Sequence, residues 1–195
     1  MTPTARCCSC WRTSVRRLDG TSPPSTVTPA LQRVLDNLRV PALVKTPTFQ
    51  IVGWNRAAVA VICDYAALPE QGRNMLRRVF HPDSAEFLPH ADDMRRTCLA
   101  AFRVDIARAG ASQDAAALVD ELMATSADFR RLWAENALHT HGVKHRRIDR
   151  PSVGELSFEV STFSVDDSDG LSLLVLSPVD EASAHGVERL LRELP

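Results

Sequence analysis

The sequence lacks an excess of basic residues, and this limits the partners that the chain can have. It contains 23 lysines and arginines against 24 aspartates and glutamates, for a net charge of −1. A stand-alone nucleic-acid-binding protein usually has a basic excess, because neutralised phosphates supply most of its affinity. We therefore expect no direct binding of nucleic acid by this chain alone. The one basic cluster that stands out, Lys144 to Arg150, is interpreted as a solvated strand edge, with phosphate contact as the alternative.

Long apolar runs and catalytic motifs are also missing. No stretch approaches the roughly 18 apolar residues that a membrane span needs, and the N-terminus has no apolar segment typical of a signal peptide. We expect a soluble, cytoplasmic protein with no membrane partner. The sequence contains no Gly-x-Ser-x-Gly, no phosphate-cradling glycine loop and no His-Glu-x-x-His. We therefore expect no enzyme activity, no catalytic residues and no cofactor.

Metal-binding patterns are incomplete. Two groups of potential ligands occur: Cys7, Cys8 and Cys10, and His139, His141 and His145. No second pair of ligands follows the cysteines at a zinc-site spacing. The histidines would share one face of a strand, because side chains on a strand repeat every two residues, but no carboxylate or fourth histidine completes the set. We expect no metal, and reduced thiols.

Two parts of the chain differ in pattern. Residues 1–27 show no sustained period of 2 or 3.6, which predicts an irregular or disordered lead, native or from a misassigned or frameshifted start. From Thr28 the pattern is regular, and 195 residues with 45% hydrophobic content suit one domain, at 28–195. Leu31, Val34, Leu35 and Leu38 form the stripe of an amphipathic helix that Thr28 and Pro29 open.

The remaining elements alternate between strand and helix patterns. The expected elements are strands at 41–45 and 49–54, a helix capped by Asn55, a short helix at 74–79, helices at 84–109, from Ser112 and from a capping box at Thr125–Asp128, strands at 139–148, 156–161 and 171–176, and a last helix up to Leu194. The strand at 171–176 is apolar on both faces, which predicts a central position. This order predicts an α+β fold, PAS-like, in which an antiparallel sheet of about five strands is covered by helices inserted between strands two and three.

Several short motifs, in this order and spacing, resemble the ligand-binding domain of MmyB-like transcription regulators. They are Pro41-Ala42, Trp54-Asn55-Arg56-Ala57-Ala58, Asp64, Arg73-Asn74, Phe80, Leu118-Val119-Asp120-Glu121-Leu122, Ser126, Phe129-Arg130, Leu132-Trp133-Ala134 and Pro151-Ser152-Val153-Gly154-Glu155-Leu156. The resemblance runs from about Val27 to the C-terminus.

The resemblance implies a PAS-like sensor domain of a bacterial transcription regulator, attached in the usual family member to an Xre-type helix-turn-helix. Some members hold a fatty-acid-like molecule in an internal pocket. This sequence departs from the pattern because it contains no helix-turn-helix, has Arg150 in place of the His of a His-Pro pair, and has Ala91-Asp92-Asp93-Met94 where an Asp-Trp pair often occurs.

A fatty-acid-like ligand would need fixed donors at its polar end. Arg73 and Asn74 are the first candidates, with Asn55 as a further donor, because an arginine fork can hold a carboxylate with two parallel bonds. The alternative is a surface arginine for Arg73 and simple helix caps for both asparagines.

Aromatic side chains are the candidates for the apolar wall of such a pocket. They are Trp54, Phe80, Phe102, Phe129 and Trp133. The alternative for each of them is ordinary core packing. The expected partner is therefore a small apolar ligand. Two other interpretations remain open: a dimerisation module, forming a homodimer or modulating an intact regulator, and the remnant of a truncated regulator.

Overall fold

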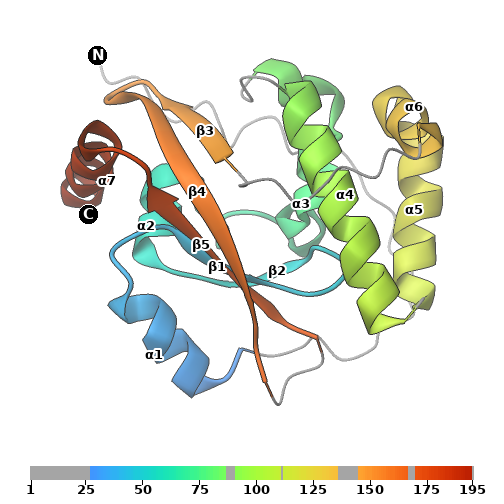
Figure 1. Ribbon diagram of the computed structural model, residues 1–195, viewed down its shortest axis with the longest axis horizontal. Helices are drawn as coiled ribbons and strands as arrows, with labels where there is room; N and C mark the ends of the chain where they lie inside the picture. The colour runs from blue at the N-terminus through green and yellow to red at the C-terminus, as the bar shows by residue number, and fades with distance from the viewer. Residues whose placement is uncertain (1–26, 87–90, 111, 136–144, 167–169, 195) are drawn as a thin grey trace.

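The computed structural model describes residues 27–86, 91–110, 112–135, 145–166 and 170–194 (Figure 1). The predicted irregular lead lies almost entirely outside these ranges and stays a prediction. The elements in chain order are α1 (Pro29–Asn37), β1 (Ala42–Lys45), β2 (Ile51–Trp54), α2 (Arg56–Val61), η2 (Glu70–Arg73), α3 (Met75–Val79), η3 (Pro82–Glu86), α4 (Ala91–Ala109), α5 (Gln113–Thr125), α6 (Ala127–Ala134), β3 (His145–Arg150), β4 (Gly154–Ser164), β5 (Ser172–Pro178) and α7 (Glu181–Glu193).

The strands form one five-stranded sheet in the order β2-β1-β5-β4-β3, with every neighbouring pair antiparallel. Strand β5 lies in the middle, which confirms the position predicted from its apolar character. Helices α2 to α6 all occur in the chain between β2 and β3. The predicted α+β class is confirmed, and the arrangement is consistent with a PAS-like fold.

Polar caps start the helices at the predicted residues. The side chains of Thr28, Asn55 and Ser112 each accept a hydrogen bond from a backbone amide in the first turn of the helix that follows. Such a bond satisfies one of the amides that a helix start leaves without an intrahelical partner. These starts depend on local chemistry alone, which is why the sequence predicts them.

Two helix starts differ from the prediction. The cap of α6 is Ser126, one residue later than the predicted capping box, and its hydroxyl accepts from the Phe129 amide at 3.2 Å. The helix predicted from Ser84 does not begin there as an α-helix, because residues 82–86 form the 3-10 helix η3. The Ser84 hydroxyl turns back to donate to the Val79 carbonyl at 3.0 Å. Helix α4 is described only from Ala91.

The sheet has two differently covered faces. The outer face, with Val44 and Leu173, is covered by α1, whose Leu35 is fully buried there. Val34, predicted on the same stripe, is half exposed. The inner face faces α2 to α6, and α7 packs beside α2 at the opposite end of the sheet from α4, α5 and α6 (Figure 1). No helix in the described ranges is long and apolar enough to cross a membrane.

Two of the apolar clusters on the inner side lie next to each other. The helical-layer cluster consists of Phe49, Leu76, Val79, Phe80, Cys98, Leu99, Phe102, Ala115, Leu118, Leu122, Phe129 and Leu132. The sheet cluster consists of Leu43, Ile51, Ala58, Cys63, Tyr65, Leu68 and Leu174. Met75, at the start of α3, packs against both clusters. The thioether of Met75 therefore marks the place where the helical layer meets the sheet.

Candidate functional site

Four of the predicted aromatic residues come together in the helical layer. Phe80 meets Phe129 edge-on with ring centroids 5.0 Å apart, and Phe129 stacks on Trp133 at 5.3 Å. Phe102 meets Phe49 edge-on at 5.6 Å. The phenylalanines are buried and Trp133 is partly buried. The structure thus gathers these side chains in one apolar body, and their contact with a ligand stays a prediction.

Trp54 and Arg73 lie together beside the sheet cluster. The Trp54 ring is 5.6 Å from the ring of Tyr65, and the Arg73 guanidinium lies 5.5 Å from the Trp54 ring centroid. Arg73 Nε also donates to the Leu68 carbonyl at 3.2 Å. Arg73 is therefore held by a stacking contact and one hydrogen bond at the end of η2.

Asn55 is buried, and its side chain is fully used within the protein. Its Oδ1 accepts from the amides of Ala42 and Ala58 at 3.1 and 2.9 Å. Its Nδ2 donates to the carbonyls of Leu38 and Val40, both at 2.9 Å. Asn55 thus ties the start of α2 to the segment that leads into β1.

Asn74 is also buried and has a similar role. Its Oδ1 accepts from the amides of Leu76 and Arg77, and its Nδ2 donates to the Thr48 carbonyl at 2.8 Å. This side chain therefore caps α3 and fastens it to the turn between β1 and β2. The contacts of both asparagines are those of helix caps, and a ligand contact from either of them stays a prediction.

The basic cluster on β3 differs from the solvated edge that the sequence predicts. Burial alternates along the strand, so that Arg146, Ile148 and Arg150 are partly buried while His145 and Arg147 are exposed. Two of the arginines therefore face the interior. The alternation was available in the sequence, because a strand directs every second side chain to the same face.

Arg150 caps the C-terminal end of α2. Its Nε donates to the Val61 carbonyl at 2.7 Å, and its Nη2 donates to the carbonyls of Ala60 and Ile62 at 3.3 and 2.8 Å. The last carbonyls of a helix have no intrahelical donor, and a cation there also interacts favourably with the helix dipole. The departure from the His-Pro pattern thus has a structural role.

Arg146 reaches from β3 to α4, and sequence reasoning missed it as a site residue. Its Nη1 contacts the Met94 sulfur, and its Nη2 lies 3.9 Å from the Cys98 sulfur. Both sulfurs belong to α4, one turn apart. Thioether and thiol sulfurs are weak hydrogen-bond acceptors. The guanidinium therefore lies between the sheet and the helical layer. Neither of these two sulfur partners is a strong acceptor.

Tyr65 is buried in the sheet cluster close to this cation. Burial raises the pKa of its phenol well above the usual range, and Cys63 raises that pKa further. The positive charges of Arg78 and Arg146 act in the opposite direction and lower the pKa. The phenol therefore stays protonated at neutral pH.

Lys45 is a second inward-facing cation, at the other end of α4. Its side chain is 3% exposed, forms an ion pair with Asp105 of α4, and lies 4.0 Å from the Phe49 ring centroid. A buried charge is tolerated only when it is paired. This ion pair joins the end of β1 to the last turns of α4.

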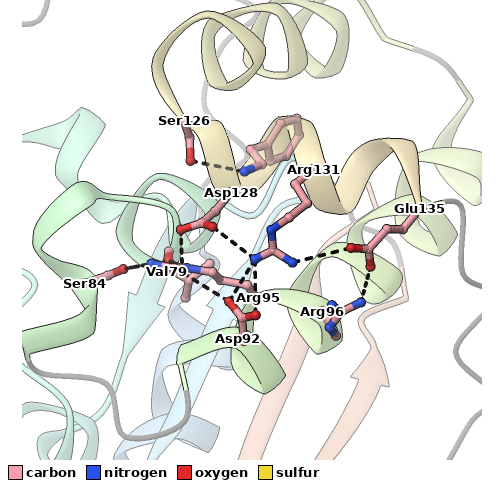
Figure 2. Close-up of polar contacts among 10 residues, drawn as sticks. Val79, Ser84, Asp92, Arg95, Arg96, Ser126, Asp128, Arg131 and Glu135 are labelled. Atoms are coloured by element: carbon pink, nitrogen blue, oxygen red, sulfur yellow. Dashed lines mark hydrogen bonds and ion pairs between the residues drawn. The ribbon is translucent and has the colours of Figure 1, made fainter.

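A network of ion pairs joins α4 to α6 (Figure 2). Its centre is Arg95, whose side chain is 8% exposed and pairs with Asp128 at 2.7 Å. Arg95 Nε donates to the Val79 carbonyl at 2.9 Å, and its Nη2 donates to the Ser84 hydroxyl at 2.8 Å. Arg95 therefore holds together α3, η3, α4 and α6.

The outer part of this network is exposed. Arg131 pairs with Asp92 at 3.2 Å, Asp128 at 3.0 Å and Glu135 at 3.4 Å, and Arg96 also pairs with Glu135 (Figure 2). Hydrogen bonding from Arg96, followed by the charges of Arg96 and Arg131, lowers the pKa of Glu135. Partners such as Arg95 and Asp128 lie on different helices, so no local sequence pattern could have predicted them.

Metal ligands are a separate question. Most of the ligands considered from the sequence lie outside the described residues: Cys7, Cys8, Cys10, His139 and His141. Within the described ranges, no group of three or more His, Cys, Asp or Glu side chains is arranged to hold a metal ion. Cys63 and Cys98 are buried thiols that form no disulfide with each other.

A family model decides the identity of the domain. The model described as MmyB-like transcription regulator ligand binding domain matches residues 27–190. The chain belongs to this family. The match begins just before α1 and ends within α7, so the MmyB-like domain includes the whole sheet, α1 to α6 and most of α7. No curated protein matches the chain.

The family defines the function at a coarse level. The chain is the ligand-binding domain of a transcription regulator family. The functional site expected of such a domain is a ligand-binding site.

Proposed function

We propose that this MmyB-like domain binds a small apolar or fatty-acid-like molecule between the inner face of the sheet and the helical layer. The observation that carries the proposal is the meeting of two apolar clusters at Met75. Ligand sites are predominantly apolar with a few placed polar groups. The inner side of this domain has that composition, with aromatic rings, methionines and only a few inward-facing cations.

The side chains at this boundary suit an elongated apolar ligand. Met75 and Met94 are unbranched and flexible, so they can change rotamer to accommodate an acyl chain. Phe80, Phe102 and Phe129 supply a firmer apolar wall beside them. Trp54 and Arg73 extend the proposed lining toward η2.

Ligand binding would act through linkage between two sites. A ligand that binds one conformation of the domain more tightly shifts the population toward that conformation. In an intact bacterial regulator in the cytoplasm, this shift would change the arrangement of an attached DNA-binding domain or of a dimer. The chain itself needs no direct contact with nucleic acid for this role.

Extraction of the purified protein tests the proposal. We expect that denaturing extraction followed by mass spectrometry releases a stoichiometric fatty acid or similar apolar molecule. We also expect that dodecanoic acid raises the melting temperature of delipidated protein. Phe102→Ala should abolish both effects, whereas Val34→Ala, at an exposed position on the outer side, should preserve them. Protein that releases no apolar molecule and shows no thermal shift with dodecanoic acid would contradict the proposal.

A second candidate function is dimerisation with another copy of this domain. Phe163 pairs in register with Leu173, so it lies on the outer face of the sheet, and 54% of it is exposed. An exposed aromatic ring on a sheet face can contribute to an interface where it belongs to a contiguous apolar patch. Sedimentation velocity would detect a dimer that Phe163→Ser converts to monomer; a chain that is monomeric at all concentrations would exclude this candidate.

A further inference from the structure

Arg146 differs from the other interior-facing arginines in the atoms that it contacts. Arg77 forms two parallel bonds with the Glu121 carboxylate, at 2.8 and 2.7 Å. Arg95 has two carboxylates, a carbonyl and a hydroxyl, and Arg150 has three carbonyls. For Arg146, the contacts within the described part of the chain are to sulfur atoms.

The position of Arg146 in the fold is also distinctive. It lies on the inward-facing side of β3, opposite the fully buried Phe158 of β4. Among the residues that the structure describes, no aspartate or glutamate forms an ion pair with it. A partly buried cation without an anionic partner is costly, because burial disfavours the charged form unless another group compensates it.

An anionic ligand would supply the missing partner. A guanidinium has a planar fork of donors that fits a carboxylate with two parallel bonds, and it stays charged at any physiological pH. Met94, which contacts Arg146, packs against the helical-layer cluster. A head group held at Arg146 would therefore place its apolar tail next to that cluster.

We propose that the Arg146 guanidinium binds the carboxylate, or an equivalent anionic head group, of the ligand, and that the tail passes along Met94 and Met75 into the helical-layer cluster. This inference rests on the proposed function and assigns the polar end of the ligand to β3. It differs from the assignment to Arg73 and Asn74 that the sequence favoured. The Arg146 guanidinium exchanges two weak sulfur contacts for two charge-assisted hydrogen bonds.

A comparison of an acid with its neutral analogue tests the inference. Binding of dodecanoic acid and of dodecan-1-ol would be measured by isothermal titration calorimetry on delipidated protein and on three variants. Arg146→Met replaces the cation with an apolar side chain that suits the neighbouring sulfurs. Arg147→Met is the matched control, because Arg147 is the next residue on β3 and faces solvent. Arg73→Met tests the rival position.

Arg146→Met should weaken the binding of dodecanoic acid by about 10- to 100-fold, since a hydrogen bond to a charged group contributes that much. The same variant should leave dodecan-1-ol binding unchanged or tighter. Arg147→Met should bind both probes as the unmodified protein does. Arg73→Met, which changes the proposed lining and not the head-group position, should change the affinities for the acid and the alcohol to the same extent. With dodecanoic acid labelled with carbon-13 at the carboxyl, the bound acid should titrate at a lower pH in the unmodified protein than in Arg146→Met.

The remaining outcomes have distinct meanings. If the unmodified protein binds neither probe, the proposed function fails and the inference fails with it. If it binds the acid but Arg146→Met retains full affinity, or loses acid and alcohol binding equally, Arg146 is not the anion site, and the proposed function stands. Loss of acid binding in Arg73→Met alone would assign the polar end to η2 instead.

Discussion

Two guanidinium groups at helix α4, those of Arg95 and Arg146, have different kinds of hydrogen-bond partners. Arg95, on α4 itself, is almost completely buried, and its donors meet the oxygens of Val79, Ser84 and Asp128 (Figure 2). Arg146 reaches α4 from β3 and meets two sulfurs. The first group is satisfied by the protein, which is typical of a structural role. The second keeps donor capacity that the described residues do not use, which is typical of a binding role.

The largest loss of stability should come from removing the Arg95 guanidinium, whose donors are satisfied by the protein. Arg95→Met deletes the hydrogen bonds to Val79 and Ser84 and the ion pair with Asp128, so we expect a loss of about 2–3 kcal/mol in the free energy of unfolding. Urea unfolding followed by circular dichroism measures this loss. Arg96→Met, in the exposed part of the same network, is the control and should lose much less. Equal losses in the two variants would contradict the structural role assigned to Arg95.

Replacement of Arg146 should change the free energy of unfolding in the opposite direction. Arg146→Met places an apolar side chain beside Met94 and Cys98, and replacement of a poorly compensated charge by a packed apolar group is often neutral or stabilising. We expect a change between zero and a gain of about 1 kcal/mol in the same urea experiment. A loss as large as that of Arg95→Met would show that the cation supports the fold and would remove the contrast between the two sites.

Tyr65 gives a test of the interior near Arg146 that depends on pH. Burial raises its pKa, so the neutral phenol stabilises the folded state fully below pH 10, and this contribution is lost as pH rises above 10. Tyr65 is the only tyrosine in the chain, so phenolate absorbance reports on it alone. We expect Tyr65→Phe to lose less stability than the unmodified protein between neutral and strongly alkaline pH. If phenolate absorbance appeared near pH 10 while the protein was still folded, it would contradict the burial of Tyr65.

The fold could be predicted from the sequence because its signals are local. Thr28, Asn55 and Ser112 are caps that act on the amides immediately after them. The apolar residues of β5 indicated a central strand without reference to any partner. The antiparallel sheet of about five strands and the insertion of the helices between strands two and three followed from the order of these elements, whereas the full strand order did not.

The candidate site could be predicted only in part, because its contacts join distant segments. The aromatic residues Phe80, Phe129 and Trp133 were named and do lie together. Arg146 was counted with a solvated edge, since its charge was considered before the alternation along β3. Its meeting with Cys98 depends on how α4 lies against the sheet, which no local pattern encodes.

The smallest effect concerns the exposed part of the α4–α6 network. Arg96 and Arg131 lower the pKa of Glu135, so the ionised carboxylate contributes stability above its ordinary value of 4.5, and that contribution is lost as pH falls through the lower folded-state value. Glu135→Gln should therefore be slightly less stable than the unmodified protein at neutral pH, and the difference should vanish in acid and shrink in high salt. Thermal unfolding at neutral and acidic pH, with and without added sodium chloride, measures both trends. A difference that persists in acid would mean that the Glu135 side chain contributes by packing rather than by charge, and the separation of this network into a buried centre at Arg95 and a solvent-screened edge would no longer hold.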